Sequence, residues 1–381
     1  MRRTITGGLC VLAFAGGLSA QINAASGSAP APAKALCRDL GPQGNWNETA
    51  RFVAGMGGGA YAKELLPETQ AAWATYSRSL LFDWNGLRRR QLDPIALWRN
   101  RWLDRKGSGG VAFYPFSGPD AVNVLAFFPD AREYVLMGLE PVGCVPASAR
   151  DYTPDYFPDL RESLQTSITL GFFKTDDMRR AFRESEVRGV LPLLLVMLAR
   201  SGYAIADVTA EGITPAGTLA PASAQVRRVT PGVAIRFQDS QHGTRVLRYF
   251  SANLENSVLT RNPGTVKYLE NLQVGGTLVK SASYLMHKKY FSTVRGLILA
   301  RGQAVVEDDS GIPFHFLDRA VWDVRLFGTY TKPIAMFAEW YQEDLVAAYA
   351  ASKEPEPLEF GIGYKWQPKQ STLILGIRRG R

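Results

Sequence analysis

The feature of this sequence that most constrains its fold is a strand–turn–helix–strand pattern between residues 111 and 139. Residues 111–116 and 134–139 are short apolar runs of strand type, a Ser-Gly-Pro-Asp turn follows the first run, and residues 121–128 have helical character. Two strands joined through one helix are parallel, and such a crossover is right-handed. The pattern therefore predicts a parallel sheet with helices packed on it.

The remaining segments extend this prediction to most of the chain. Residues 48–106 have helical spacing of their apolar positions, which predicts an α-helical N-terminal layer. Further helices are expected at 160–173, 176–200, 291–300 and 334–351, and further strands at 203–213, 233–238, 244–250, 277–283, 304–307, 358–366 and 372–378. The predicted fold class is α/β: a Rossmann-like mixed, mainly parallel sheet with helices on both faces and antiparallel edge strands.

The N-terminus has the pattern of a cleavable secretory signal peptide. Arg2 and Arg3 precede an uncharged apolar run, and Leu18-Ser19-Ala20 offers a cleavage site after Ala20, with Ala24 as the alternative. Residues 21–36 are mostly Ala, Pro, Ser and Gly, a composition typical of a disordered tether. We therefore expect a signal peptide at 1–20, a tether at 21–36, a helical region at 37–106 and an α/β domain at 107–381, in a periplasmic or secreted protein.

The charge balance indicates an anionic partner. The chain carries a net charge of +9, and loss of Arg2 and Arg3 with the signal peptide leaves +7. This charge favours an anionic envelope component, such as lipid headgroups or acidic polysaccharide. An unknown small molecule is the other expected partner. Nucleic acid is not expected because the basic residues are dispersed, and no later segment has the length of a membrane anchor.

Two cysteines, Cys37 and Cys144, remain after signal cleavage. In an oxidising compartment they are candidates for a disulfide between the N-terminal arm and the main domain; the alternative is two unrelated buried thiols. No metal site is predicted, because the chain has no His-Glu-x-x-His motif and two cysteines do not make a structural zinc site. No cofactor is predicted either.

Candidate site residues follow from the rule that ligands bind beyond the carboxyl ends of the strands in open α/β sheets. Polar side chains that follow predicted strands, together with one histidine, therefore take priority. The candidate catalytic residues are Ser117, Asp120, Glu140, His287, Asp308 and Asp309, and the candidate ligand-binding residues are Ser281, Ser283, Tyr284 and Ser310.

Each candidate also has a structural interpretation. Asp308 and Asp309 can raise one another's pKa or bind a cation, but they also suit a turn before Gly311. Asp120 suits a helix N-cap, and Ser117 is outside a Gly-x-Ser-x-Gly elbow. His287 is the histidine best placed for acid–base chemistry, although a structural role is the alternative.

Two resemblances accompany these residues. The layout from Ser117 to Glu140, with a terminal pair of strands, resembles the sheet of Rossmann-like methyltransferases, although Phe116-Ser117-Gly118-Pro119 replaces the glycine-rich loop. The phrases YPFSGPD (114–120), GLEPVG (138–143) and DDSGIP (308–313) resemble a set of uncharacterised exported bacterial proteins. The second resemblance implies no activity.

Three functions therefore stay open. The first is a binding protein of the cell envelope that holds its ligand in an α/β cleft without chemistry. The second is an unrecognised hydrolase or transferase that uses the candidate residues, and the third is a methyltransferase-like relative. Convergence of the candidate side chains in one cleft is the feature that separates the first two, so whether the chain is an enzyme is left open.

Overall fold

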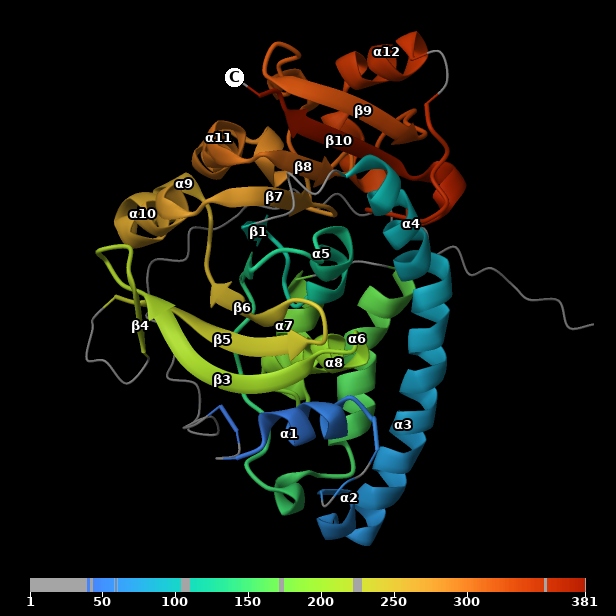
Figure 1. Cartoon of the computed structure of the whole chain (residues 1–381), viewed down its shortest axis with the longest axis vertical. Helices are drawn as coiled ribbons and strands as arrows, with labels where there is room; N and C mark the ends of the chain where they lie inside the picture. Colours follow the sequence, from blue (N-terminus) through green and yellow to red (C-terminus); the bar gives the residue numbers. More distant parts are fainter. Residues whose placement is uncertain are drawn as a thin grey trace, which may run out of the picture. The chain divides into compact units, whose positions relative to one another are not determined.

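A ten-stranded mixed sheet is the centre of the fold (Figure 1). The computed structural model describes residues 40–380 except 42–43, 58, 60, 104–109, 171–174, 222–227 and 353–354. The predicted signal peptide, the predicted tether and Cys37 lie outside the described residues, and Asp39–Arg381 forms one compact unit. The strands are β1 (Val111–Tyr114), β2 (Glu133–Gly138), β3 (Ala204–Ile213), β4 (Leu219–Pro221), β5 (Thr230–Asp239), β6 (Gly243–Ser251), β7 (Val274–Val279), β8 (Ala304–Glu307), β9 (Trp322–Gly328) and β10 (Thr372–Arg378).

The strand order is β4-β3-β5-β6-β2-β1-β7-β8-β10-β9. The five central strands from β6 to β8 are parallel, and antiparallel pairings lie on both sides of them. Successive parallel strands move from β1 to β2 and β6 on one side, then return to β7 and β8 on the other. The order of strands therefore reverses between β1 and β7, and this is where open α/β sheets place their ligands.

Helices cover both faces of the sheet, as predicted. They are α1 (Trp46–Val53), α2 (Tyr61–Glu64), α3 (Pro67–Leu87), α4 (Asp93–Trp102), α5 (Ala121–Phe127), α6 (Tyr156–Leu170), α7 (Thr175–Glu184), α8 (Leu191–Arg200), α9 (Asn256–Arg261), α10 (Pro263–Asn271), α11 (Ser292–Arg301) and α12 (Glu343–Ala351). Alternate residues of β1 face opposite cores: Ala112 and Tyr114 pack with α5 and α8, whereas Val111 and Phe113 pack with α11 and α12.

The predicted N-terminal helical layer is confirmed. A π-helical turn, η1 (Arg88–Leu92), joins α3 to α4, and Figure 1 shows these three elements as one long helix beside the sheet. Trp84 and Trp98 turn inward from this helix and are buried. Over the described parts of the chain, no helix combines the length and the apolar character that a membrane span requires.

Several predicted elements differ in the structure; the strand expected at 111–116, for example, ends at Tyr114. The helix expected at 176–200 is two helices, and Pro192 lies in the first turn of α8, where proline is tolerated.

The strand expected at 277–283 is β7, which begins at Val274 and ends at Val279. It includes Gly276 because a Cβ there would lie 2.2 Å from the Phe128 ring. Glycine inside this strand is therefore a packing requirement and not a turn signal.

The C-terminal region differs most. The helix expected at 334–351 begins only at Glu343, because the preceding 3-10 segment (Ala335–Trp340) is broken at Phe337. The strand expected at 358–366 is absent from the described residues there, which make only isolated bridges. A Cβ at Gly361 would lie 1.4 Å from the carbonyl oxygen of Trp366, so the chain turns back on itself at this point. β10 instead pairs antiparallel with β8 on one side and with β9 on the other.

Candidate functional site

The loops that follow β1, β7 and β8 meet at one edge of the sheet. Tyr114 of β1 is level with Leu136 of β2, and Val279 of β7 is level with Glu307 of β8. Because these strands are parallel, their carboxyl ends adjoin, and the candidate residues that follow them lie at the same edge. This edge contains the reversal in strand order between β1 and β7.

A buried ion pair joins two of these loops across the reversal. Lys280 follows β7 directly, and its Nζ lies 2.6 Å from Oδ2 of Asp120 in the loop after β1. Asp120 also accepts hydrogen bonds from the Tyr114 hydroxyl (2.9 Å) and from Nδ2 of Asn123 (2.8 Å to Oδ1). The side chains of Lys280 and Asp120 are only 1% and 2% exposed, so this pair is fixed inside the protein.

This geometry corrects the expected role of Asp120. The residue stands at the N-cap position of α5, but its side chain makes no capping hydrogen bond. The carboxylate is directed to Lys280 instead, because a buried ammonium needs a nearby opposite charge more strongly than helix amides need a side-chain cap.

Ser117 and Glu140 lie together beside the loop after β1. The Ser117 hydroxyl donates to backbone carbonyls, at 3.0 Å from Gly118 O and 3.2 Å from Met137 O. The Tyr249 hydroxyl donates to the carbonyl of Glu140 at 2.9 Å, and a Cβ at Gly118 would lie 3.5 Å from Glu140 Oε2. Ser117 is therefore engaged by backbone, and these contacts do not include a catalytic base.

Asp308 and Ser310 tie the loop after β8 to the loop after β7. Asp308 accepts hydrogen bonds from the amide of Ser281 (3.1 Å), the amide of Ser310 (3.0 Å) and the Ser310 hydroxyl (2.6 Å). The Ser310 hydroxyl oxygen in turn accepts from the amide of Ala282 at 2.8 Å. Burial and the neighbouring Asp309 carboxylate raise the pKa of Asp308 to about 7. Asp308 therefore accepts hydrogen bonds within the turn before Gly311, as the turn interpretation expected, and its pKa is also strongly raised.

Asp309 is buried next to Asp308 but has different partners. Its carboxylate accepts a hydrogen bond from the Tyr284 hydroxyl, and its carbonyl accepts one from Nε2 of Gln342 at 3.0 Å. Burial raises the pKa of Asp309, against the hydrogen bond from Tyr284, which lowers it. Two adjacent buried carboxyl groups thus share this edge with different contacts.

The loop after β7 is conformationally strained. Ser281, Ser283 and Tyr284 have φ values of 49°, 51° and 51°, and Phe116 in the neighbouring loop has 56°. Each such residue costs about 1–2 kcal/mol, and such conformations persist only where surrounding contacts enforce them. Here Tyr364 enforces them, because its hydroxyl donates to Ser281 O at 2.8 Å and accepts from the amide of Ser283 at 3.0 Å.

His287 borders the strained loop within a group of aromatic rings. It lies in a 3-10 turn (Leu285–His287), its ring is 5.1 Å from that of Tyr284 and 5.7 Å from that of Trp340, and its Nε2 is buried without a hydrogen-bond partner among the described residues. Burial above all, with help from His315 and Arg295, lowers the pKa of His287 to about 4. The ring is therefore neutral at pH 7. The contacts of His287 fit the structural role that was the alternative to acid–base chemistry.

Lysines and aromatic rings form a half-exposed surface over the ends of β7 and β8. Lys288 Nζ lies 5.8 Å from the ring centres of both Tyr290 and Trp340, and Lys365 Nζ lies 5.4 Å from that of Tyr330. The Phe337 ring is 5.1 Å from both Tyr284 and Tyr364. We define the lysine–aromatic surface as Lys288, Tyr290, Phe337, Trp340, Tyr364 and Lys365.

Sequence reasoning did not single out several members of this site. Glu307, the last residue of β8, is fully buried; its Oε2 accepts from the amide of Ile312 at 2.7 Å, and burial raises its pKa well above the ordinary value. An acidic residue that ends an apolar strand was a usable signal for Glu307. Lys280 lies in the segment 280–287 that its lysine, hydroxyls and histidine had marked for acid–base chemistry, but nothing local indicated its pairing with Asp120. Tyr364 gave no signal, since its partners are distant in sequence.

The candidate residues therefore share one edge in two groups. Ser117 and Asp120 belong to the loop after β1, and Glu140 adjoins this loop. The other group links the loops after β7 and β8, and the Lys280–Asp120 pair connects the two groups. Within the described residues no group of histidine, cysteine or acidic side chains has the arrangement of a metal site. Comparisons with protein-family models, with curated proteins and with solved structures found no match for this chain.

Proposed function

We propose that this chain is an exported cell-envelope protein that binds an acidic polysaccharide on the lysine–aromatic surface. The observation that carries the proposal is the position of this surface, directly over the strained loop at the carboxyl ends of β7 and β8. Ligands of open α/β sheets bind at this edge. A rigid loop beneath a binding surface keeps its side chains in place, which lowers the entropy lost on binding.

The chemistry of the surface supports this class of ligand. The ammonium groups of Lys288 and Lys365 attract carboxylate groups on a polymer. The half-exposed rings of Phe337, Trp340 and Tyr364 offer apolar, electron-rich faces against which the C–H face of a sugar ring packs. The net charge of +7 that remains after the predicted signal cleavage acts in the same direction over the whole molecule.

The contacts of the candidate catalytic residues favour binding over catalysis. Ser117 is engaged by backbone carbonyls, Asp120 by Lys280, and Asp308 by two amides and a hydroxyl. A nucleophile needs a general base within hydrogen-bond distance, and the hydrogen bonds described for Ser117 do not provide one. These side chains build the support of the binding surface.

A binding and turnover assay on the mature protein tests the proposal. We expect saturable binding of polygalacturonate in calorimetry, weaker binding in higher salt, no binding of the neutral glucan pullulan, and no shortening of either polymer. Tighter binding to phosphatidylglycerol vesicles than to polygalacturonate would assign the surface to lipid and overturn the proposal. Purified protein from the periplasm should begin at Gln21, as the predicted cleavage after Ala20 requires.

A hydrolase or transferase is the second candidate, favoured by one observation. Asp308 has a pKa of about 7, and the adjacent Asp309 also has a raised pKa. Three strained residues lie in the neighbouring loop. Perturbed carboxyl groups and strained backbone are both found together at active sites. If this candidate is right, the protein cleaves polygalacturonate or another glycan, and Asp309→Asn abolishes this cleavage. The Ser117→Ala variant should remain folded. Cleavage by the wild type would replace the binding proposal.

A methyltransferase-like relative is the third candidate. The order β6-β2-β1-β7-β8 is that of a doubly wound nucleotide-binding sheet, which supports the resemblance in architecture. The Lys280–Asp120 pair, however, ties together the two loops between which a nucleotide would bind. We rank this candidate last for that reason.

A further inference from the structure

A cavity lies away from the lysine–aromatic surface, between the long N-terminal helix and α5. It has a volume of about 420 Å³ and is lined by η1 and α4 on one side and by α5 and the segment joining α8 to β3 on the other. Pro129 and Tyr203 in its lining precede the first residues of β2 and β3. The cavity therefore lies at the amino ends of these strands, opposite the site described above.

The lining of this cavity carries an excess of positive charge. It contains Arg88, Arg99 and Arg200 but only one carboxylate, Asp93, which lies 3.8 Å from Arg88 (Nε to Oδ1). The net charge of the lining is therefore +2. Arg99 and Arg200 are half-buried, and burial lowers the pKa of both guanidinium groups.

Neither half-buried guanidinium forms a close ion pair in the described part of the chain, although the Asp130 carboxylate is near enough to raise the pKa of Arg99 against the effect of burial. Arg99 donates to Ala126 O at 2.9 Å and to Asn100 Oδ1 at 3.2 Å, and Arg200 donates to Ala54 O at 2.7 Å and to Gly55 O at 3.2 Å. All four acceptors are neutral. Buried charges are normally paired, so the half-buried Arg99 guanidinium, which forms no close ion pair among the described residues and lines the cavity, favours an anion there.

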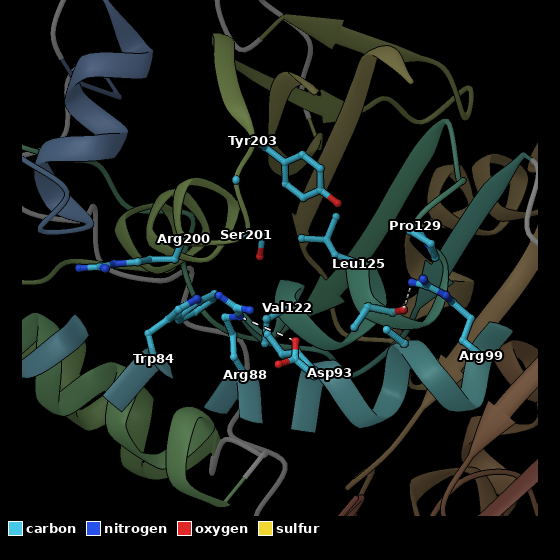
Figure 2. A pocket seen from close by; sticks show the side chains of 14 residues that line it. Trp84, Arg88, Asp93, Arg99, Val122, Leu125, Pro129, Arg200, Ser201 and Tyr203 are labelled. Atoms are coloured by element: carbon cyan, nitrogen blue, oxygen red, sulfur yellow. Dashed lines mark hydrogen bonds and ion pairs between the residues drawn. The ribbon is translucent and has the colours of Figure 1, made fainter. Parts of the chain in front are cut away.

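The positions of the side chains locate this anion. Figure 2 shows Arg88 and Asp93 on one side of the cavity and Arg99 on the other, with Tyr203 above Leu125 and Ser201 above Val122. Arg200 directs its guanidinium away from the other two arginines, toward the end of α1. The contact positions for an anion are therefore Arg88 and Arg99.

We propose that this cavity binds a small organic phosphate, with the phosphate between Arg88 and Arg99. A phosphate monoester carries close to two negative charges at pH 7, and Arg88 and Arg99 are the two cations of the lining on either side of it. Arginine donors suit phosphate oxygens, and the hydroxyl groups of Ser201 and Tyr203 supply further donors. The side chains of Val122 and Leu125 give the organic part an apolar contact. This site is independent of the polysaccharide surface.

Three variants with opposite expected signs test the proposal in calorimetric titrations with hexyl phosphate. Arg88→Gln should weaken binding about tenfold, because it removes a charged donor, and Asp93→Asn should tighten binding several-fold, because it removes the only carboxylate. Arg89→Gln is the matched control: it lies in the same π-helical turn, but its side chain is not part of the lining. Arg88 and Asp93 are both more than half exposed, so neither substitution should unfold the protein.

Two further probes separate the contributions of charge and apolar contact. Inorganic phosphate should bind more weakly than hexyl phosphate, and hexanol should not bind measurably. The proposal is overturned if hexyl phosphate does not bind, if hexanol binds equally well, or if Arg88→Gln and Arg89→Gln behave alike. Binding of inorganic phosphate as tight as that of hexyl phosphate would contradict the assigned apolar contact.

Discussion

Nζ of Lys280 lies 2.6 Å from Oδ2 of Asp120, and both side chains are almost completely buried. This ion pair connects the loop after β1 with the end of β7, where the order of the parallel strands reverses. A ligand at this position would have to separate the two charges in a poorly solvated place. The pair is therefore the main structural reason to place ligand binding above this edge and not within it.

Removing one member of the pair should destabilise the protein strongly. Lys280→Met leaves the Asp120 carboxylate buried without its cation, and we expect a loss of about 3–5 kcal/mol in the free energy of unfolding, measured in urea. The double variant Lys280→Met with Asp120→Leu should lose less than Lys280→Met alone. Arg236→Met, which breaks a half-exposed pair with Asp207, is the control and should cost less than about 1 kcal/mol. Equal losses for the buried and exposed pairs would contradict this role.

His287 should make stability depend on pH in the acid range. Burial lowers its pKa from 6.5 to about 4, so the unfolded chain takes up a proton at a higher pH than the folded protein. The stability that His287 contributes is therefore present above pH 6.5 and is lost as the pH falls toward 4. Relative to His287→Phe, the wild type should lose roughly 1–3 kcal/mol over this range in urea unfolding. Parallel stability profiles of the two proteins would show that the histidine is solvated.

Gly363 should be required by the Asp308 carboxylate. Its φ is 74°, and a Cβ there would lie 1.8 Å from Oδ2 of Asp308. Gly243 has a similar φ of 68° but open space around it, so Gly243→Ala measures the cost of the backbone conformation alone, about 1–2 kcal/mol. Gly363→Ala should cost a further 1–3 kcal/mol or so in thermal or urea unfolding, because the Cβ overlaps the carboxylate. If both alanine variants are equally stable, Asp308 is not held as described.

The Cys37–Cys144 disulfide stays a prediction, because Cys37 lies outside the described residues. Protein purified from the periplasm should show no thiol that reacts with a maleimide under denaturing conditions. Mass spectrometry without reduction should detect a peptide that contains both cysteines. Two reactive thiols in the denatured protein would favour the alternative of unrelated cysteines.

The bounds of strands could be predicted from the sequence where an apolar run ends at clear turn residues. The predicted bounds of the strands at 304–307 and 372–378 are those of β8 and β10. β9 was missed because it is half-exposed and carries charges at Asp323 and Arg325, which interrupt its apolar pattern. The segment 358–366 has the apolar residues of a strand but does not form one, because its backbone turns back at Gly361 and passes close to the Trp366 carbonyl.

The candidate site was predictable in position and not in its contacts. The rule for strand ends placed Asp120, Asp308 and Asp309 at one edge, because it depends only on strand direction. The pairing of Asp120 with Lys280 joins segments far apart in the chain, and no local pattern indicates it. The positive φ values of Ser283 and Tyr284 were equally hidden, since these residue types rarely adopt them.

Binding of polygalacturonate to matched surface variants tests the central claim most directly. Trp340→Ala with Lys288→Gln alters the lysine–aromatic surface, whereas Phe82→Ala with Arg89→Gln removes an exposed aromatic ring and a charge from the long N-terminal helix. Both double variants lose one positive charge, so a difference in their binding reports where the polymer binds on the protein. We expect the first pair to weaken binding at least about tenfold and the second to leave it within about twofold. Equal weakening by both pairs, or none by the first, would contradict a binding surface at the ends of β7 and β8.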